Sequence, residues 1–286
     1  RSTPKPSSAA SDVYKRQMMG DSVVINLTNE TPTFQKEWRL LPFRVDDAFT
    51  AMALDEAILK LNSEGKSPNT VRFWRWNPSA VSIGCFQSLE REVALDVAGR
   101  YGVDVVRRIT GGGAVFHDYD GELTYGVVCR EEDVPHDIIE SYRLICGGLV
   151  EGLERLGLHA EFKPVNDVQV RGKKISGSAQ TRRWGSVLQH GTVLISPDVR
   201  RMFELLKVSP EKISDKFIAS VFERVTTVER ELGRKPSFEE VREAMIAGFE
   251  ESLGVKLVEG EPTEEELKLA EELRPKYASE KWLRKR

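Results

Sequence analysis

The sequence predicts an α+β fold in which a mixed or antiparallel central sheet is flanked by helices. Short β-like segments dominate the middle of the chain, and segments with helical spacing of apolar residues lie on both sides of them. The helices do not alternate with the strands one by one, as a doubly wound parallel sheet would require. The chain has 286 residues, 40% hydrophobic and 30% charged, which allows one large core or two small ones.

The first half of the chain is expected to begin with a strand over Trp38–Phe43, a short apolar run. A helix is expected over Asp46–Leu61, because four apolar residues there recur at spacings of three and four. Either Asp46 or Asp47 is placed to cap that helix. The other segments expected in this half are strands over 71–76, 80–86, 104–109 and 122–129 and a helix over 91–101.

The second half is expected to open with a long helix over Ile138–Leu156 and to become helical again near its end. A capping box, a serine or threonine followed three residues later by glutamate, starts a helix at Ser237 and Glu240. Thr263 with Glu266 is placed to start another, and 277–286 is expected to be a short charged terminus. The strands expected in this half cover 159–163, 168–170, 174–178 and 187–195.

Composition limits the class of protein. Residues 1–17 are polar and lack the apolar core of a signal peptide, so they are expected to be a disordered tail or a scar, which leaves 18–286 as one domain. No apolar run reaches the roughly 20 residues that cross a membrane. A net charge of −3 argues against a nucleic-acid partner. Three sparse cysteines exclude a disulfide framework, so a cytoplasmic location is expected.

A glycine-rich loop follows the strand expected over 104–109. Two basic residues, Arg107 and Arg108, precede three consecutive glycines, Gly111–Gly113. Glycine lets the backbone approach a ligand closely, and arginine offers a fork of donors to an anion. The loop is therefore a candidate anion cradle. The alternative is a turn between two strands with an exposed arginine.

A second candidate site surrounds Lys174, which precedes a run of small residues from Ser176 to Ala179. Small residues would leave room for a ligand, and a lysine facing that room would pair with its negative charge. Lys173 should point to the opposite face, because side chains alternate along a strand. The preceding Asn166-Asp167 pair is a candidate magnesium site or a simple turn. Taken without its context, Lys174 is more readily interpreted as a solvated lysine on an exposed strand.

The histidines and cysteines have simpler expected roles. His190-Gly191-Thr192 is a candidate for the pocket lining, but a structural hydrogen bond is favoured for His190. His117 is expected to brace a loop by a hydrogen bond, because one histidine and Asp118 are too few ligands for a metal site. Cys85 has no cationic neighbour in sequence, so an inert thiol is favoured over a nucleophile. Cys129 and Cys146 lie in apolar contexts and are expected in the core.

These motifs together resemble the lipoate–protein ligase family over most of the chain from Trp38 onward. The matching stretches are Arg108–Asp118, Asn166-Asp167, Lys174–Ala179 and His190–Thr192. The resemblance implies a catalytic domain related to that of biotin ligases. It also implies that the enzyme uses ATP and magnesium to activate lipoate as lipoyl-adenylate, then transfers the lipoyl group to a lysine of a lipoyl domain.

The resemblance also implies roles for individual residues. Lys174 would be catalytic, touching both the lipoyl carboxylate and the α-phosphate, and Asp167 would approach magnesium. The apolar tail of lipoate would lie against candidates such as Phe73, Trp76, Ile83 and Val115. The residues implied to bind the nucleotide and lipoate are Arg108, Gly111, Gly112, Gly113, Ala114, Val115, Phe116, Asn166, Asp167, Lys174 and Gly177.

The expected partners follow from the same resemblance. The acceptor would be the lipoyl domain of a 2-oxoacid dehydrogenase or the H protein of glycine cleavage. Longer family members carry a C-terminal accessory domain, and the sequence ends near Trp282. Either a separate accessory protein or an enzyme restricted to part of the reaction is therefore expected.

Two other functions stay open at this level. Related octanoyltransferases, which take octanoyl from a carrier protein, share the glycine loop and a stretch like Lys174–Arg182 but use a cysteine just before it, where Phe162–Asp167 has none. A non-catalytic module that binds acyl groups or lipoyl domains is the third reading, against which the intact motifs count. A biotin ligase is disfavoured because its Gly-Arg-Gly-Arg-x-Gly loop is absent.

Overall fold

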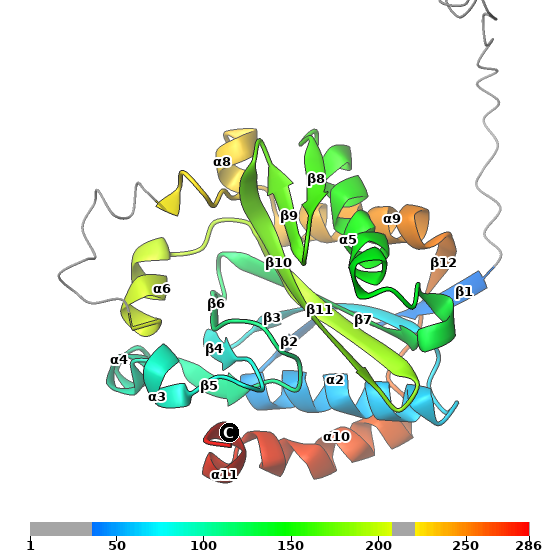
Figure 1. The fold of residues 1–286 in the computed structure, drawn as a ribbon, viewed down its shortest axis with the longest axis horizontal. Helices are drawn as coiled ribbons and strands as arrows, with labels where there is room; N and C mark the ends of the chain where they lie inside the picture. Colours follow the sequence, from blue (N-terminus) through cyan, green and yellow to red (C-terminus); the bar gives the residue numbers. More distant parts are fainter. Residues whose placement is uncertain (1–35, 208–220, 286) are drawn as a thin grey trace, which may run out of the picture. The chain divides into compact units, whose positions relative to one another are not determined.

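The computed structural model describes residues 36–207 and 221–285. Residues 1–17, expected from the sequence to be a tail or a scar, lie outside this part of the chain. One compact unit spans Phe34–Arg286. The expected fold class is confirmed: a mixed central sheet is flanked by helices on both faces (Figure 1).

A nine-stranded sheet forms the centre of the described residues. Eight strands follow the order β12-β1-β3-β7-β11-β10-β9-β8, and β2 pairs with β3. The sheet is mixed because β1 runs parallel to both β12 and β3, whereas β3, β7, β11, β10, β9 and β8 pair antiparallel in turn. The strands are β1 Lys36–Leu40, β2 Arg44–Asp46, β3 Thr70–Trp76, β7 Glu122–Arg130, β8 Ala160–Lys163, β9 Asp167–Val170, β10 Lys173–Arg183, β11 Ser186–Leu194 and β12 Val255–Glu259.

A three-stranded sheet carries the glycine loop. Its order is β5-β4-β6, with β4 (Ala80–Ile83) parallel to β5 (Asp104–Arg107) and antiparallel to β6 (Val115–His117). The strand expected over 80–86 therefore ends at Ile83, and the one expected over 104–109 ends at Arg107. The loop between β5 and β6 contains Arg108 and the three glycines, so the small sheet holds both ends of that loop.

Helices α5 (Ile138–Arg155) and α9 (Phe238–Leu253) pack against one face of the large sheet (Figure 1). Their crossing depends on glycine: a Cβ built on Gly248 would lie 2.2 Å from the carbonyl oxygen of Gly148 and 2.4 Å from the backbone nitrogen of Gly152. The helices therefore touch backbone to backbone. The largest apolar core lies between them and the sheet.

Helices α2 (Ala48–Ser63) and α10 (Glu264–Tyr277) lie side by side and cover the opposite face (Figure 1). Asp47 caps α2 by accepting hydrogen bonds from the backbone of Phe49 and Thr50, which resolves the choice between Asp46 and Asp47. Thr263 and Glu266 form the reciprocal capping box of α10. A second core lies between these helices and the sheet.

Shorter helices complete the described fold. Helix α6 lies close to the small sheet, and its Met202, together with Leu206 just after the helix, reaches the cavity described below. The shorter elements are α3 Leu89–Glu92, α4 Leu95–Tyr101, η1 Glu131–Asp133, α6 Val199–Leu205, α8 Val228–Leu232 and α11 Glu280–Leu283. None of the helices in the described ranges is long and apolar enough to cross a membrane.

Two local expectations differ from the structure. The helix expected over 91–101 is broken at Val93 and Ala94, which lie in extended or irregular backbone with their side chains buried. Ser237 caps α9, but Glu240 pairs with Arg234 instead of completing a capping box. These differences arise from burial and from a longer-range charge pair, neither of which local sequence spacing contains.

The C-terminal segment is also more ordered than expected. Tyr277 is 1% exposed and ends α10, where a short charged terminus was predicted. Trp282 donates its indole N–H to the carbonyl of Arg107, 2.8 Å away, and Arg107 donates in return to the carbonyl of Leu283 at 2.7 Å. The end of the described chain is therefore docked onto β5, immediately before the glycine loop.

Candidate functional site

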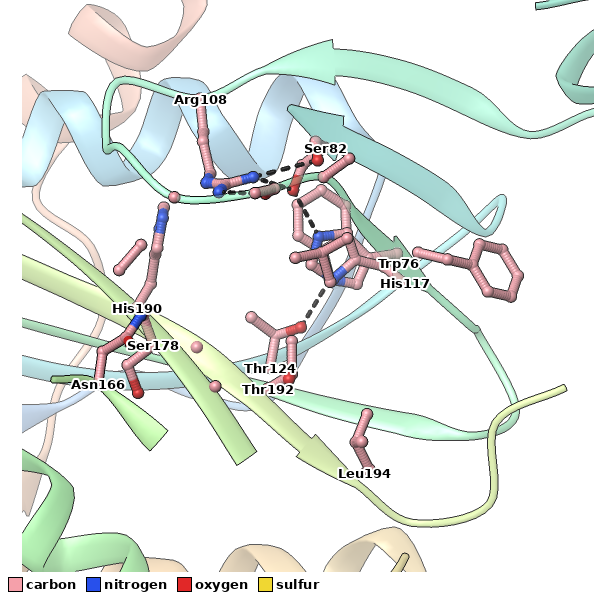
Figure 2. A pocket seen from close by; sticks show the side chains of 18 of the residues that line it. Trp76, Ser82, Arg108, His117, Thr124, Asn166, Ser178, His190, Thr192 and Leu194 are labelled. Atoms are coloured by element: carbon pink, nitrogen blue, oxygen red, sulfur yellow. Dashed lines mark hydrogen bonds between the residues drawn. The ribbon is translucent and has the colours of Figure 1, made fainter. Parts of the chain in front are cut away.

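A cavity of about 320 Å³ lies between the small sheet and the β7, β10 and β11 strands of the large sheet (Figure 2). This volume is at the lower end of the usual range for small-ligand sites. Its walls are mostly apolar, with polar groups from the glycine loop and from β10. The lining residues are Met52, Trp74, Trp76, Ser82, Arg108, Gly112, Gly113, Ala114, Val115, Phe116, His117, Thr124, Asn166, Lys174, Gly177, Ser178, Ala179, His190, Gly191, Thr192, Leu194, Met202, Leu206 and Val225.

Arg108 holds the glycine loop in place. Its guanidinium donates to the carbonyls of Gly111 and Gly113, each at 2.7 Å, to Thr110 Oγ1 at 3.1 Å, and to the carbonyl and hydroxyl oxygens of Ser82 at 3.1 and 3.0 Å. These bonds occupy the full set of guanidinium N–H donors. Burial lowers the pKa of Arg108 to about 10, so it remains charged at neutral pH.

The loop lies so close to β4 that only glycine fits at the contact. A Cβ on Gly84 would lie 2.2 Å from the carbonyl oxygen of Gly112, and Gly112 itself has a φ of +88°. Gly113 has open space where a Cβ would be. Here the close approach is between two backbone segments, at Gly84 and Gly112. The expected approach of the glycine backbone to a ligand stays a prediction.

Lys174 lies at the other side of the cavity and is 39% exposed along its side chain. Its Nζ is 2.7 Å from Oδ1 of Asp167 on the adjacent strand β9. Asn166 donates from Nδ2 to the carbonyl of Ser178 at 2.5 Å and thereby fixes the turn before β9 against β10. The Asn-Asp pair thus has internal partners: one amide holds the strand and one carboxylate holds the lysine.

The structure brings most of the predicted site residues together around this cavity. Lys174 lines it and Lys173 does not, as the expected alternation implied. Gly111 and Asp167 do not line it, although each contacts a residue that does. Of the residues suggested for the apolar slot, Trp76 and Val115 line the cavity, but Phe73 packs against Phe249 and Ile83 lies in the core of the small sheet.

The two histidines form buried hydrogen bonds, as expected. His190 contacts Asp55 Oδ2 through Nδ1 and Thr110 Oγ1 through Nε2, both at 2.8 Å. His117 contacts Ser82 Oγ at 2.8 Å and Glu122 Oε1 at 2.9 Å. Both rings therefore connect the glycine loop or the small sheet to the large sheet.

Several cavity residues were not identified from the sequence. Ser82 and Thr124 are ordinary strand residues in sequence, and Met202 and Leu206 come from the α6 region, which no motif marks. Ser82 and Thr124 could have been identified as cavity residues from the strands expected over 80–86 and 122–129. Side chains alternate between the two faces of a strand, which assigns each of these residues to one face.

No cysteine of the described chain lines the cavity. Cys146 contacts a residue of the lining, since its Sγ is 3.6 Å from Oγ of Ser178. Burial raises the pKa of Cys146 to about 11 and that of Cys129 to about 12. Both buried thiols are therefore held in the unreactive protonated form.

Comparison with known proteins adds independent information. The family described as "Lipoyl protein ligase A/B catalytic domain" matches residues 47–250. The octanoyltransferase LipM of Symbiobacterium thermophilum is 40% identical over 87% of this chain and 98% of its own length. The octanoyltransferase LipM of Brevibacillus brevis is 38% identical over 86% of this chain and 98% of its own length.

A solved structure is similar at the level of the whole fold. It is the bi-partite lipoate protein ligase of Thermoplasma acidophilum, described together with its E2 lipoyl domain. The identity is 37%, the TM-score is 0.79, and the alignment covers 87% of this chain and 97% of that one.

The octanoyltransferase relatives overturn the prediction of ATP-dependent lipoate activation, and with it the predicted ATP and magnesium cofactors. That prediction was wrong because it read the Asn166-Asp167 pair and the missing upstream cysteine as marks of adenylation. In the structure the carboxylate of Asp167 pairs with Lys174, and Asn166 holds β10. Both side chains of the motif therefore have partners within the protein.

Proposed function

The chain belongs to the lipoyl protein ligase A/B catalytic-domain family, and from this membership we propose that it transfers an octanoyl group from a thioester on an acyl carrier protein to one lysine of a lipoyl domain. An acyl thioester is already activated, so its transfer to an amine needs no ATP. The observation that carries the proposal is a largely apolar cavity with a lysine ammonium at one side.

The apolar wall is proposed to hold the octanoyl chain. Trp76, Leu194 and Met202 contribute to this wall from three different elements, so it surrounds the chain instead of forming a flat surface. Burying methylene groups there is favourable by about 0.8 kcal/mol for each one removed from water. A polar acyl group would lose this contribution, which favours a simple fatty acyl substrate.

Lys174 is proposed to stabilise the negative charge that develops on the thioester carbonyl oxygen during attack. Preorganised charge in a partly dry site is effective because it needs no reorganisation as the reaction proceeds. Asp167 holds the ammonium in position at 2.7 Å. Arg108 shapes the facing loop through its five donors and adds a second fixed positive charge.

The proposed partners are an octanoyl carrier protein as donor and a lipoyl domain as acceptor. A lipoyl domain as acceptor is consistent with the Thermoplasma relative, which is described together with its E2 lipoyl domain. A separate accessory protein, predicted for the adenylating reaction, has no step to perform in thioester transfer. Its requirement is tested by omitting and adding it in the assay below.

The test is octanoylation of a lipoyl domain, measured by intact mass, with octanoyl carrier protein as donor and no ATP. The expected product is a lipoyl domain carrying one octanoyl group, and none when its acceptor lysine is replaced by arginine. Lys174→Met should slow the reaction on the order of 10²–10³-fold. Lys173→Met is the matched control, because Lys173 is the neighbouring lysine outside the cavity, and it should react normally.

No product from the thioester donor with the wild-type protein would overturn the proposed function. Equal losses in Lys174→Met and Lys173→Met would leave the transfer but remove the role proposed for Lys174.

A further inference from the structure

A transfer enzyme of this kind either moves the acyl group directly or holds it on one of its own side chains. No cysteine of the described residues reaches the cavity. The cavity does contain a buried serine, Ser82, whose hydroxyl is hydrogen-bonded to His117 (Figure 2). The other ring nitrogen of His117 contacts Glu122, so the three side chains form a row.

The row has the geometry of a nucleophile, a base and an orienting carboxylate. Ser82 Oγ lies 2.8 Å from Nε2 of His117, and Nδ1 of the same ring lies 2.9 and 3.2 Å from the two oxygens of Glu122. Such arrangements are recognised by geometry and roles and recur on unrelated folds. Ser82 and His117 both line the cavity, whereas Glu122 is fully buried behind them.

The surrounding donors fix the direction of each hydrogen bond. Trp76 can only donate, so its Nε1 donates to Thr124 Oγ1 at 2.7 Å, and Thr124 donates in turn to Glu122. A carboxylate that accepts from Thr124 also accepts from Nδ1–H of His117. Nε2 of a neutral ring is then the acceptor that faces Ser82.

Ser82 receives its own fixed donor from the opposite side. Arg108 donates from Nη1 to Ser82 Oγ at 3.0 Å and has no acceptor atom, so the hydroxyl hydrogen of Ser82 is free to point at His117. The same charge would stabilise the serine oxygen as its proton leaves. The ring of His117 is stacked on Trp76, with ring centroids 4.1 Å apart, which keeps Nε2 aimed at the serine.

We propose that Ser82 is the nucleophile of the acyl transfer, with His117 as its general base and Glu122 as the group that orients the imidazole. This inference rests on the proposed transfer of an acyl group from a thioester. The observation that supports it is a hydroxyl at the cavity whose hydrogen points at an imidazole nitrogen.

Two steps follow, each balanced in atoms and protons. In the first, Ser82 Oγ attacks the thioester carbonyl carbon, its proton passes to His117 Nε2, the carbon–sulfur bond breaks, and the departing thiolate takes that proton. In the second, the acceptor lysine amine attacks the serine ester, and His117 takes a proton from the amine. The carbon–oxygen bond then breaks and Ser82 recovers its proton, leaving an amide on the lipoyl domain.

The test is to trap the acyl-enzyme. The full-length protein is mixed with octanoyl carrier protein without a lipoyl domain, quenched in acid, and measured by intact mass and peptide mapping. The expected result is one octanoyl group on the peptide that contains Ser82, stable to neutral hydroxylamine, which cleaves thioesters. Ser82→Ala should give no adduct and slow transfer by about 10³-fold or more.

Variants separate this mechanism from a structural role. Ser82→Cys should carry the octanoyl group as a thioester that neutral hydroxylamine removes, a result that a merely structural serine would not give. Glu122→Gln should slow formation of the adduct on the order of 10²–10⁴-fold. Ser88→Ala is the matched control, since Ser88 lies on the same segment outside the cavity, and it should form the adduct normally.

The outcomes distinguish this inference from the proposed function. Normal octanoylation of the lipoyl domain by Ser82→Ala, or an octanoyl group trapped on Cys85 or Cys146, would overturn the role of Ser82 and leave the transfer intact. Absence of any product and of any adduct with the wild-type protein would overturn both.

Discussion

The ammonium of Lys174 lies 2.7 Å from the carboxylate of Asp167, and the space it occupies exists because residue 177 has no side chain. A Cβ built on Gly177 would lie 2.6 Å from Lys174 Nζ and 2.7 Å from its Cε. Three residues on two neighbouring strands therefore fix one cation at the cavity. The relationship explains why a glycine lies in the middle of a buried strand, where it is otherwise unfavourable.

Gly177→Ala should displace the ammonium of Lys174 without unfolding the protein, because the clash is with the end of a flexible side chain. Misplacing a catalytic group by about 1 Å can cost on the order of 10²-fold in rate. The transfer rate of Gly177→Ala should therefore fall by roughly that factor, while the melting temperature changes little. In a Lys174→Ala background the same substitution should have almost no further effect, and additive losses would show that Gly177 acts through another residue.

Glu266 should be one of the most sensitive positions for stability. It is fully buried and accepts from two nitrogens of Arg39, at 2.5 and 2.8 Å, from Ser67 and from the backbone of Thr263. Burial alone would raise the pKa of Glu266, but Arg39 and its other donors lower it. Glu266→Gln leaves a buried guanidinium without its charge partner and should lower the free energy of unfolding by about 3–5 kcal/mol.

The matched control is Glu251→Gln, which breaks the exposed pair with Arg155 and should cost only about 0–1 kcal/mol in urea unfolding. Similar losses for the two glutamates would contradict the account of the buried pair.

Gly248→Ala should separate α5 from α9. The added methyl group would meet backbone atoms of Gly148 and Gly152, which do not rotate away as a side chain would. Overpacking of this kind costs typically about 1–3 kcal/mol, and more where backbone must move. Thermal unfolding should therefore show a lowered melting temperature. Gly99→Ala, in a helix with open space at that position, should be neutral or stabilising, and a neutral Gly248→Ala would contradict the close crossing.

The stability of the protein should fall on the acid side of neutrality through His190. Burial lowers the pKa of His190 below its ordinary value of 6.5, although Asp55 opposes the change. The unfolded chain then binds a proton before the folded one does, so this contribution is complete above about pH 6.5 and is lost as the pH falls toward the folded pKa.

The free energy of unfolding, measured by urea denaturation at several pH values, should therefore decrease less steeply with acidity in His190→Asn than in the wild-type protein. His159→Asn is the control, because that imidazole is almost fully exposed. An unchanged slope in His190→Asn would show that other groups set the acid sensitivity.

Much of this architecture follows from patterns that are local in sequence. Spacing of apolar residues indicated α2 and α5, and alternation together with turn residues indicated β3, β4 and β7. The helix N-caps Asp47 and Thr263 could also be predicted from the sequence as candidates, because a cap involves residues only two or three positions apart. The glycine loop and Lys174 were identified from motifs, and the fold brings them to one cavity.

The remaining features depend on contacts between distant segments. Ser82, His117 and Glu122 come from three strands, and nothing in their separate surroundings shows that their side chains meet. Trp282 reaches Arg107 across most of the chain. The octanoyltransferase relatives, and not a local pattern, overturned the predicted magnesium at Asn166-Asp167. The pairing of Asp167 with Lys174 likewise became visible only when β9 was placed beside β10.

The central claim, that the acyl donor is a carrier-protein thioester, is tested most directly by letting the two possible donors compete in one reaction. Wild-type protein and a lipoyl domain are given octanoyl carrier protein with an unlabelled acyl group, together with deuterated free octanoate, ATP and magnesium, and the modified lysine is analysed by mass spectrometry. If octanoyl is transferred from the carrier-protein thioester, the lysine should carry unlabelled octanoyl. This product should form at the same rate when ATP and magnesium are left out. Deuterated octanoyl on the lysine, formed only with ATP, would contradict the claim.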